Sequence, residues 1–555
     1  MPDGGGGARI GSVRRLRSSV ATLAILYLAV ALPAATTAAV PLPAPVALPG
    51  NGSTGNAAIS AEGRFVAISS AASNLVGGDT NGVFDAFVRD RAAGTNERVS
   101  VAADGGQANG QSGVQAISSD ARFVVIWSEA TNLVSGDSNR VADLFVRDRA
   151  EGTTERISVS SDGTQANAES AIAAITPEGR FVAFDSRASK LVPGDNDDAF
   201  DVFVRDRSTD RTELVGAGSG PAISADGRFV AFERRLNSPD GPPGIYVRDR
   251  AKGVTELVSV AADGTPGNDL SGEARISADG RYVVFSSKAS NLVANDTNGP
   301  DHPGTDVFVR DRLRETTRRV SVGSDGRQAD GPSGNPSLSS NGRIVAFTSW
   351  APNLGPGKAS GVYVHDLATG ATELASVSTA GAPGDGDSYA GFRALSGDGR
   401  LVAFFSRASN LVPGDVNGQY DAFVRDREAK TTELASVARR PLLRTAPLLV
   451  LPKQPRLGKK LTLDLRTSVD GMTVFSGLAG CSARIGSVAL KALSASFRES
   501  SVWCVWRLPV GAKQQTLRGR VSVTTPYGSS SRRFALRVAS SSSLKIEHQA
   551  AATTG

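Results

Sequence analysis

Aspartate and asparagine recur at alternate positions of one polar loop, where their side-chain oxygens could share a cation. Each such loop follows a segment of the S-N-L-V type and contains a turn. Oxygen ligands spaced around a turn are what Ca²⁺ requires. The candidate ligands are Asp79, Asn81 and Asp85; Asp137, Asn139 and Asp143; Asp195, Asp197 and Asp201; Asp296, Asn298 and Asp306; and Asp415, Asn417 and Asp421.

These loop residues also have an interpretation without metal. Asp and Asn side chains accept hydrogen bonds from nearby backbone N–H groups and cap turns. No glutamate closes the loops as it does in an EF-hand, and two of the repeated segments described below lack the triplet. The sequence therefore leaves Ca²⁺, the one cofactor that it suggests, and turn capping as alternatives.

Two arginines and two cysteines stand apart from the rest of the sequence. Arg275 and Arg393 lie in segments where related segments carry Ala222 or Ser337, and we expect them to reach a central channel and an anionic ligand; a solvated side chain is the alternative. Cys481 and Cys504 are the only cysteines, and in an exported protein they predict a disulfide.

Catalytic motifs are missing from the sequence. The three histidines, His302, His365 and His548, are far apart, and neither His-Glu-x-x-His nor Gly-x-Ser-x-Gly occurs. Walker and dinucleotide-binding loops are absent as well. We therefore predict a protein that is not an enzyme. The alternative is a secreted hydrolase or lyase that uses loop aspartates at the mouth of a channel.

A unit that recurs seven times must position these residues. It reads A-I-S-x-D-G-R-F-V-A-F, then S-N-L-V-x-G-D-x-N-G, D-x-F-V-R-D-R and T-T-E-x-V-S-V. Its second segment is almost continuously apolar, which is typical of strands buried on both faces. Four short strands per unit, repeated around an axis, make a propeller. We therefore predict an all-β fold with a seven-bladed propeller of four-stranded blades, followed by a small β-sandwich.

The corner S-x-D-G-R-x-V-A-F with the following D-V-F-V-R-D resembles the TolB-type propeller repeat, a relative of the WD repeat, over residues 52–438. This resemblance implies the fold, and roles as a binding platform or as an accessory domain of peptidases. We label the four strands of a unit A to D in chain order. In an up-and-down blade the long, variable loops between strands B and C, and between strand D and strand A of the next unit, lie at one end, which we expect to be the binding face.

The remaining segments divide the chain further. Residues 1–39, with Arg14, Arg15 and an apolar run, predict a signal peptide, and 40–51 a Pro/Ala-rich linker. A second linker is predicted at 439–455, a disulfide-bonded β-sandwich at 456–539 and a disordered tail at 540–555. The sandwich segment, with C-V-W-R-L-P and L-R-G-R-V-S-V, loosely resembles Ig-like domains of secreted actinobacterial proteins.

Charge separates the two predicted domains. Residues 41–438 carry 38 basic and 50 acidic residues, whereas 439–555 carry 19 basic and 4 acidic residues. The acidic propeller argues against nucleic acid as a partner. We expect a secreted or envelope-associated monomer that does not span a membrane and that recognises a protein or a cell-envelope glycan. A structural wall component is a further alternative.

Overall fold

The computed structural model describes residues 47–438, except 235–240, 298–303 and 357–359, and the segments 443–445, 449–451, 460–469, 472–473, 478–485, 487–498, 501–509, 515–525, 528–538 and 544–545. These residues form strands and a single 3₁₀ turn, η1 (Pro352–Leu354). They contain no helix long and apolar enough to cross a membrane. The predicted signal peptide at 1–39 lies outside the described residues.

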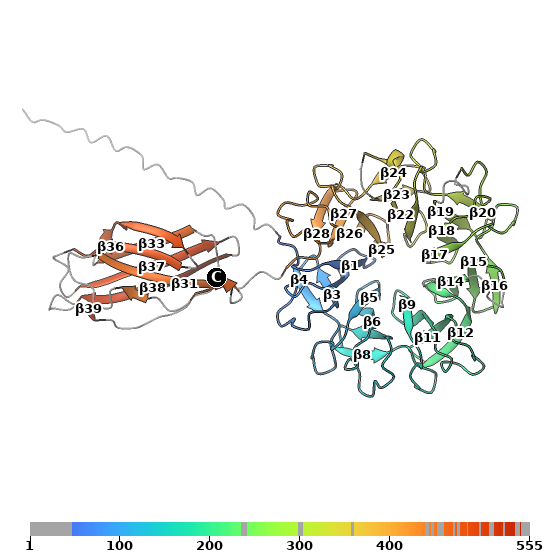
Figure 1. Ribbon diagram of the computed structural model, residues 1–555, viewed down its shortest axis with the longest axis horizontal. Helices are drawn as coiled ribbons and strands as arrows, with labels where there is room; N and C mark the ends of the chain where they lie inside the picture. Colours follow the sequence, from blue (N-terminus) through green and yellow to red (C-terminus); the bar gives the residue numbers. More distant parts are fainter. Residues whose placement is uncertain are drawn as a thin grey trace, which may run out of the picture. The chain divides into compact units, whose positions relative to one another are not determined.

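Seven four-stranded antiparallel units surround a common centre and form a β-propeller (Figure 1). Blades 1–4 are β1 (Thr54–Ile59), β2 (Phe65–Ser70), β3 (Asp85–Asp90), β4 (Thr95–Arg98); β5 (Ser112–Ile117), β6 (Phe123–Ser128), β7 (Asp143–Asp148), β8 (Thr153–Arg156); β9 (Ser170–Ile175), β10 (Phe181–Ser186), β11 (Asp201–Asp206), β12 (Arg211–Ala217); β13 (Ser219–Ile223), β14 (Phe229–Arg234), β15 (Gly244–Asp249), β16 (Val254–Leu257). Blades 5–7 are β17 (Ser271–Ile276), β18 (Tyr282–Ser287), β19 (Asp306–Asp311), β20 (Thr316–Arg319); β21 (Ser333–Leu338), β22 (Ile344–Ser349), β23 (Gly361–Asp366), β24 (Thr372–Leu374); β25 (Ser388–Leu395), β26 (Leu401–Ser406), β27 (Asp421–Asp426), β28 (Thr431–Leu434). The predicted all-β propeller architecture is confirmed.

The ring closes where the first and last blades meet. Strand β1 pairs in parallel with β25 through Ala58 and Arg393. The N–H of Gly50 donates to the carbonyl of Ser436 at 2.9 Å. In the segment that joins blade 1 to blade 2, the N–H of Ala108 donates to the carbonyl of Ser100 in the same way. The segment before β1 thus stands in for the loop that joins consecutive blades elsewhere, and ordered structure begins before residue 52.

Two sets of arginine contacts hold the blades. The arginine of each corner forms an ion pair with the Asp of V-R-D in the same blade, as Arg64 does with Asp90 at 2.6 Å. This guanidinium lowers the pKa of Asp90 to about 2. The second arginine of V-R-D-R pairs with a glutamate of the preceding blade. The pairs are Arg91–Glu433, Arg149–Glu97, Arg207–Glu155, Arg250–Glu213, Arg312–Glu256 and Arg427–Glu373.

The C-terminal domain consists of two sheets around one apolar core. One sheet contains β29 (Leu443–Thr445), β30 (Leu449–Leu451), β31 (Lys460–Val469), β32 (Met472–Thr473), β35 (Ser494–Arg498) and β36 (Ser501–Arg507). The other contains β33 (Leu478–Ile485), β34 (Val488–Leu490), β37 (Thr516–Thr525), β38 (Gly528–Val538) and β39 (Leu544–Lys545). Trp506 and Leu463 are buried in the core. Strand β39 pairs with β38, so structure extends into the tail that was predicted to be disordered from residue 540.

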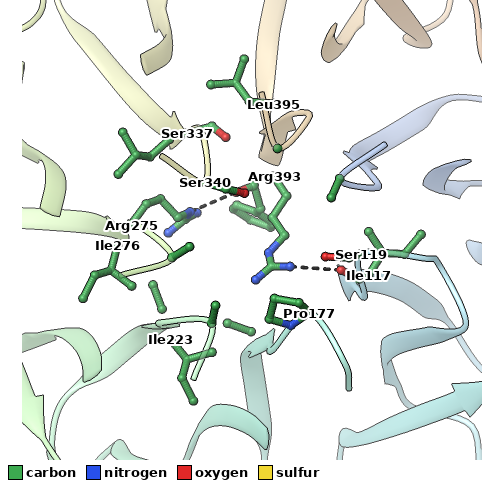
Figure 2. Close-up of a pocket in the computed structure, with 18 of the residues that line it drawn as sticks. Ile117, Ser119, Pro177, Ile223, Arg275, Ile276, Ser337, Ser340, Arg393 and Leu395 are labelled. Carbon is green, nitrogen blue, oxygen red and sulfur yellow. Dashed lines mark hydrogen bonds between the residues drawn. The ribbon is translucent and has the colours of Figure 1, made fainter. Parts of the chain in front are cut away.

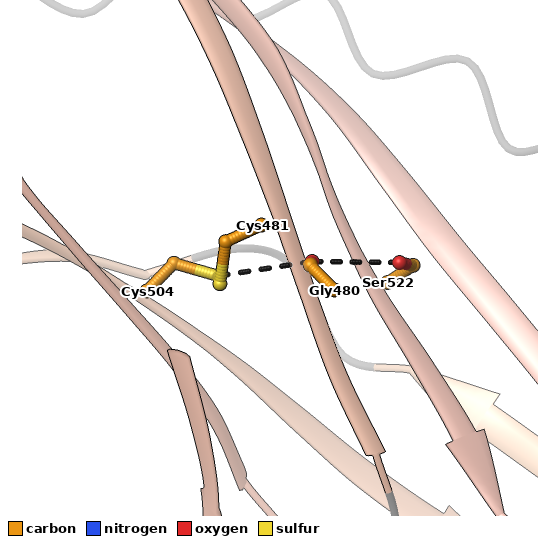
Figure 3. Close-up of a disulfide and its surroundings, with 4 residues drawn as sticks. All are labelled: Gly480, Cys481, Cys504 and Ser522. Atoms are coloured by element: carbon orange, nitrogen blue, oxygen red, sulfur yellow. Dashed lines mark hydrogen bonds between the residues drawn. A yellow bond between two sulfur atoms is a disulfide. The ribbon is translucent and has the colours of Figure 1, made fainter. Parts of the chain in front are cut away.

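The predicted disulfide is present in this domain. Cys481 in β33 and Cys504 in β36 are bonded, with their Cα atoms 5.7 Å apart (Figure 3). Because the two strands belong to different sheets, the bond links the two layers. A cross-link that closes a loop of this length restricts the unfolded chain and stabilises the domain by about 3 kcal/mol.

The glycine in the turn between strands A and B packs closely against the preceding blade, which leaves no room for a side chain there. Gly179 has a φ of +78°, and a Cβ there would lie 2.1 Å from the Phe123 ring of the preceding blade. We predict that Gly179→Ala lowers the free energy of unfolding of the propeller by about 2–4 kcal/mol, from left-handed strain and overpacking. Chemical denaturation measures this. The control is Gly163→Ala, where φ is +85° but no atom lies within 4 Å. Equal losses in both variants would contradict the packing argument.

Candidate functional site

An internal arginine occupies the predicted Ca²⁺ position of blade 1. The Arg98 guanidinium lies 3.5 Å from the Asp79 carboxylate and 3.8 Å from that of Asp85. Both carboxylates are almost fully buried. A fixed cation of the protein thus offsets part of the negative charge of the pair where Ca²⁺ was predicted.

Asn81 acts as a turn cap rather than as a ligand. Its side-chain N–H group donates to Asp85 at 2.9 Å and to the Ala108 carbonyl at 3.1 Å, and its oxygen accepts the backbone N–H of Val83. The oxygen that Ca²⁺ would need is therefore turned to the backbone. Ser100 donates to the other oxygen of Asp85 at 2.5 Å.

Blades 2 and 5 repeat this arrangement. Arg156 lies 3.3 Å from Asp137 and 3.7 Å from Asp143, while the N–H of Asn139 donates to Asp143. In blade 5, Arg319 lies 2.9 Å from Asp296 and 3.4 Å from Asp306. Asn298 lies outside the described residues. The contacts of Asn81 in blade 1 and of Asn139 in blade 2 match the turn-capping interpretation.

Blades 3 and 7 keep the carboxylates but replace the arginine with leucine. Leu214 and Leu434 are paired with the phenylalanine of the neighbouring strand C in their blades. Arg98 has the same pairing position in blade 1. The carboxylate oxygens of Asp195, Asp197 and Asp201 lie within 4.8 Å of one another. In blade 7 Asp415 and Asp421 are buried, and the N–H of Asn417 donates to Asp421.

Blades 4 and 6 lack both the arginine and the aspartate that begins the third strand. Their strand C begins with Gly244 and Gly361 where blade 1 has Asp85, and Leu257 and Leu374 stand in place of Arg98. Only blades 3 and 7 therefore retain the loop acids without this arginine.

Arg275 and Arg393 point into the centre of the ring, as predicted (Figure 2). The Arg393 guanidinium donates to the carbonyls of Ile117 at 3.0 Å and of Ile175 at 2.9 Å, in blades 2 and 3. Arg275 donates to the Phe392 carbonyl at 3.0 Å. Both side chains therefore also connect blades across the channel.

An aromatic cluster on the loop face was missed by the sequence analysis. Trp350, Tyr389, Phe405 and Tyr420 are linked by ring centroid distances of 5.4 to 6.0 Å, and 45% of Trp350 is exposed. Tyr389 pairs with Phe405 where blades 2, 5 and 6 have glycine. Aligning the repeats by this glycine would have revealed the departure.

The buried Asp421 of blade 7 makes the stability of the propeller depend on pH. Burial, reinforced by the charge of Asp415, raises the pKa of Asp421 to about 7. Between pH 4 and 7 the native state then holds a proton that the unfolded state releases, so the free energy of unfolding falls as pH rises. Because the pKa of Asp306 is also raised, to about 6, we predict that Asp421→Asn makes this fall smaller without abolishing it and that Leu434→Arg reduces it less, in denaturation measured from pH 4 to 8. Asp90→Asn, at a carboxyl whose pKa is lowered, should leave the fall intact.

Ca²⁺ binding stays a hypothesis for blades 3 and 7. The full chain should melt at a higher temperature in millimolar Ca²⁺ than in chelator, because the carboxylate oxygens of Asp195, Asp197 and Asp201 lie close enough together to share one ion. The rise should disappear in Asp201→Asn combined with Asp421→Asn and persist in Asp143→Asn, where Arg156 supplies the cation. No rise in the unsubstituted chain would leave these aspartates as turn caps.

Comparisons with known proteins find propellers among the similar solved structures and assign no function. No family model matches the chain, and no curated protein matches its sequence. Among solved structures, TolB of Acinetobacter baumannii is 14% identical, with a TM-score of 0.34 over 70% of this chain and 80% of that one. The propeller domain of the Trilobed protease of Pyrococcus furiosus is 11% identical, with a TM-score of 0.42 over 67% and 92%. A puromycin-hydrolyzing peptidase of Mycobacterium tuberculosis is 13% identical, with a TM-score of 0.43 over 76% and 62%.

Proposed function

We propose that this chain is an exported binding protein whose loop face binds a neutral glycan on the aromatic cluster of Trp350, Tyr389, Phe405 and Tyr420. The observation that carries the proposal is the exposed ring of Trp350 packed on the half-buried rings of the cluster, at the end of the blades where the long loops lie. Aromatic side chains with a polar edge offer an apolar face on which the C–H face of a sugar ring stacks.

Polar groups beside the rings suit sugar hydroxyls. Arg407 and Asp387 form an ion pair at 3.0 Å, and Arg407 keeps 55% of its side chain exposed. A carboxylate accepts and a guanidinium donates, so the pair can bind neighbouring hydroxyl groups of one sugar. The acidic balance of residues 41–438 favours a neutral chain over an anionic one.

Export is supported by the disulfide, because such bonds persist in oxidising compartments. The hydrolase or lyase alternative needs loop carboxylates that are available for acid–base chemistry. In blades 1, 2 and 5 those carboxylates pair with arginine, so the described loops of these blades favour binding over turnover.

The test is calorimetric titration of the full chain with a panel of neutral hexasaccharides. Trp350→Ala and Tyr389→Gly should each weaken binding at least tenfold, or about 1.4 kcal/mol, because stacked aromatic residues dominate such interfaces. Tyr389→Gly introduces the residue that other blades carry, so the fold should tolerate it.

A matched control is Trp127→Ala, which removes an aromatic side chain at the blade 2 position equivalent to Phe405. This variant should bind as the unsubstituted chain does. Affinity for a protein partner without affinity for any hexasaccharide would refute the glycan proposal, and so would unchanged binding in Trp350→Ala.

A further inference from the structure

The centre of the propeller holds a cavity of about 140 Å³. The innermost strand of every blade contributes to its wall, as Ile59, Ile117 and Ile276 do, and so do the turns between strands A and B. Backbone hydrogen bonds link these turns from blade to blade, running from Ala225 through Ala278, Ser340 and Gly397 to Ala61. The cavity therefore lies toward the end of the ring opposite the loop face.

Two guanidinium groups are the only charged groups among the described residues that line this cavity. They belong to Arg275 in blade 5 and Arg393 in blade 7, and the remaining lining residues are apolar or neutral. Burial, together with the nearby Arg275 charge, lowers the pKa of Arg393 to about 10. The two like charges thus face each other in surroundings that solvate them poorly.

The nearest acidic side chain does not enter the cavity. Burial lowers the pKa of Arg275, and the charge of Glu273, two residues earlier in the strand, offsets only part of that shift. Its carboxylate accepts the N–H of Asn335 at 2.7 Å and the hydroxyl of Ser286 at 2.6 Å, at the junction of blades 5 and 6. Glu273 is therefore engaged by other donors on the loop-face side and does not fill the space between the arginines.

Both arginines depart from the repeat. Strand A elsewhere carries a small residue next to its terminal Ile or Leu, as Ala58, Ala116, Ala174 and Ala222 show, and Arg275 takes that position in blade 5. In blade 7, strand A is two residues longer than in blade 5. The extra residues place Phe392 over the Arg275 guanidinium, 5.6 Å from the ring centroid.

We propose that this central cavity binds a small dianion with oxygen acceptors, of the dicarboxylate or phosphate class, between Arg275 and Arg393. Two unneutralised guanidinium groups in a narrow, largely apolar space concentrate positive potential there. The volume is that of about five water molecules, which suits a small anion rather than a polymer. The site is independent of the glycan proposed for the loop face.

The experiment is calorimetric titration of the full chain with succinate and with inorganic phosphate, at constant ionic strength set by chloride. We expect saturable binding of at least one of them, with acetate binding more weakly. Arg275→Ala should reduce the affinity about tenfold or more, the loss of one charge-assisted hydrogen bond. This variant carries the residue of other blades and should therefore fold.

The charge-matched control is Arg327→Ala, at an arginine that is 83% exposed on a distant loop. It should bind the dianion as the unsubstituted chain does. Saturable binding that Arg275→Ala leaves unchanged would overturn the proposal, and so would no binding of either dianion. Because Arg393 also links blades, Arg393→Lys, which keeps the charge, provides a second variant; it should retain binding more than Arg275→Ala does.

Discussion

The propeller depends on one arginine contact that recurs between blades. Arg149 donates to Glu97 of the preceding blade at 2.9 Å and to the corner carbonyl of Ala121 at 2.8 Å, and it lies 4.9 Å from the centroid of the Phe65 ring. One planar, always charged side chain thus fixes a strand, a turn and a neighbouring core residue together. A closed ring requires the same geometry at each joint, which explains why the V-R-D-R segment varies so little.

The joint between blades 5 and 6 departs from this rule in both partners at once. Leu367 stands where the arginine would be, and Arg318 where the glutamate would be. Leu367 packs against the apolar core of that joint. The paired change avoids placing two arginines opposite each other at this joint. Most charged residues of the repeat are engaged in contacts that recur from blade to blade. Residues that bind a ligand are therefore better sought at positions that differ from the repeat, such as Tyr389, Arg275 and Leu434.

The strands, the corner and the disulfide could be predicted from the sequence because they depend on local patterns. The partner of the loop aspartates could not, because Arg98 follows Asp85 by a whole hairpin and meets it only when strands C and D pair. The prediction of Ca²⁺ ligands treated the acids as unneutralised, and in blades 1, 2 and 5 the structure shows arginine beside them. The aromatic cluster brings together residues from two blades, so only an alignment of the repeats could have indicated it.

The noncovalent joint between the first and last blades has a consequence for how the chain acquires its fold. Asn417 donates to the Gly50 carbonyl across 367 residues of sequence, whereas the other joints connect neighbouring blades along the chain. Contacts between such distant segments form slowly, because a long loop must close first. The ring therefore stays open until blade 7 has been synthesised. Until then, the innermost strands of blades 1 and 7 lack each other as partners and expose apolar faces to other chains. The incompletely folded chain is therefore most prone to aggregation at this seam.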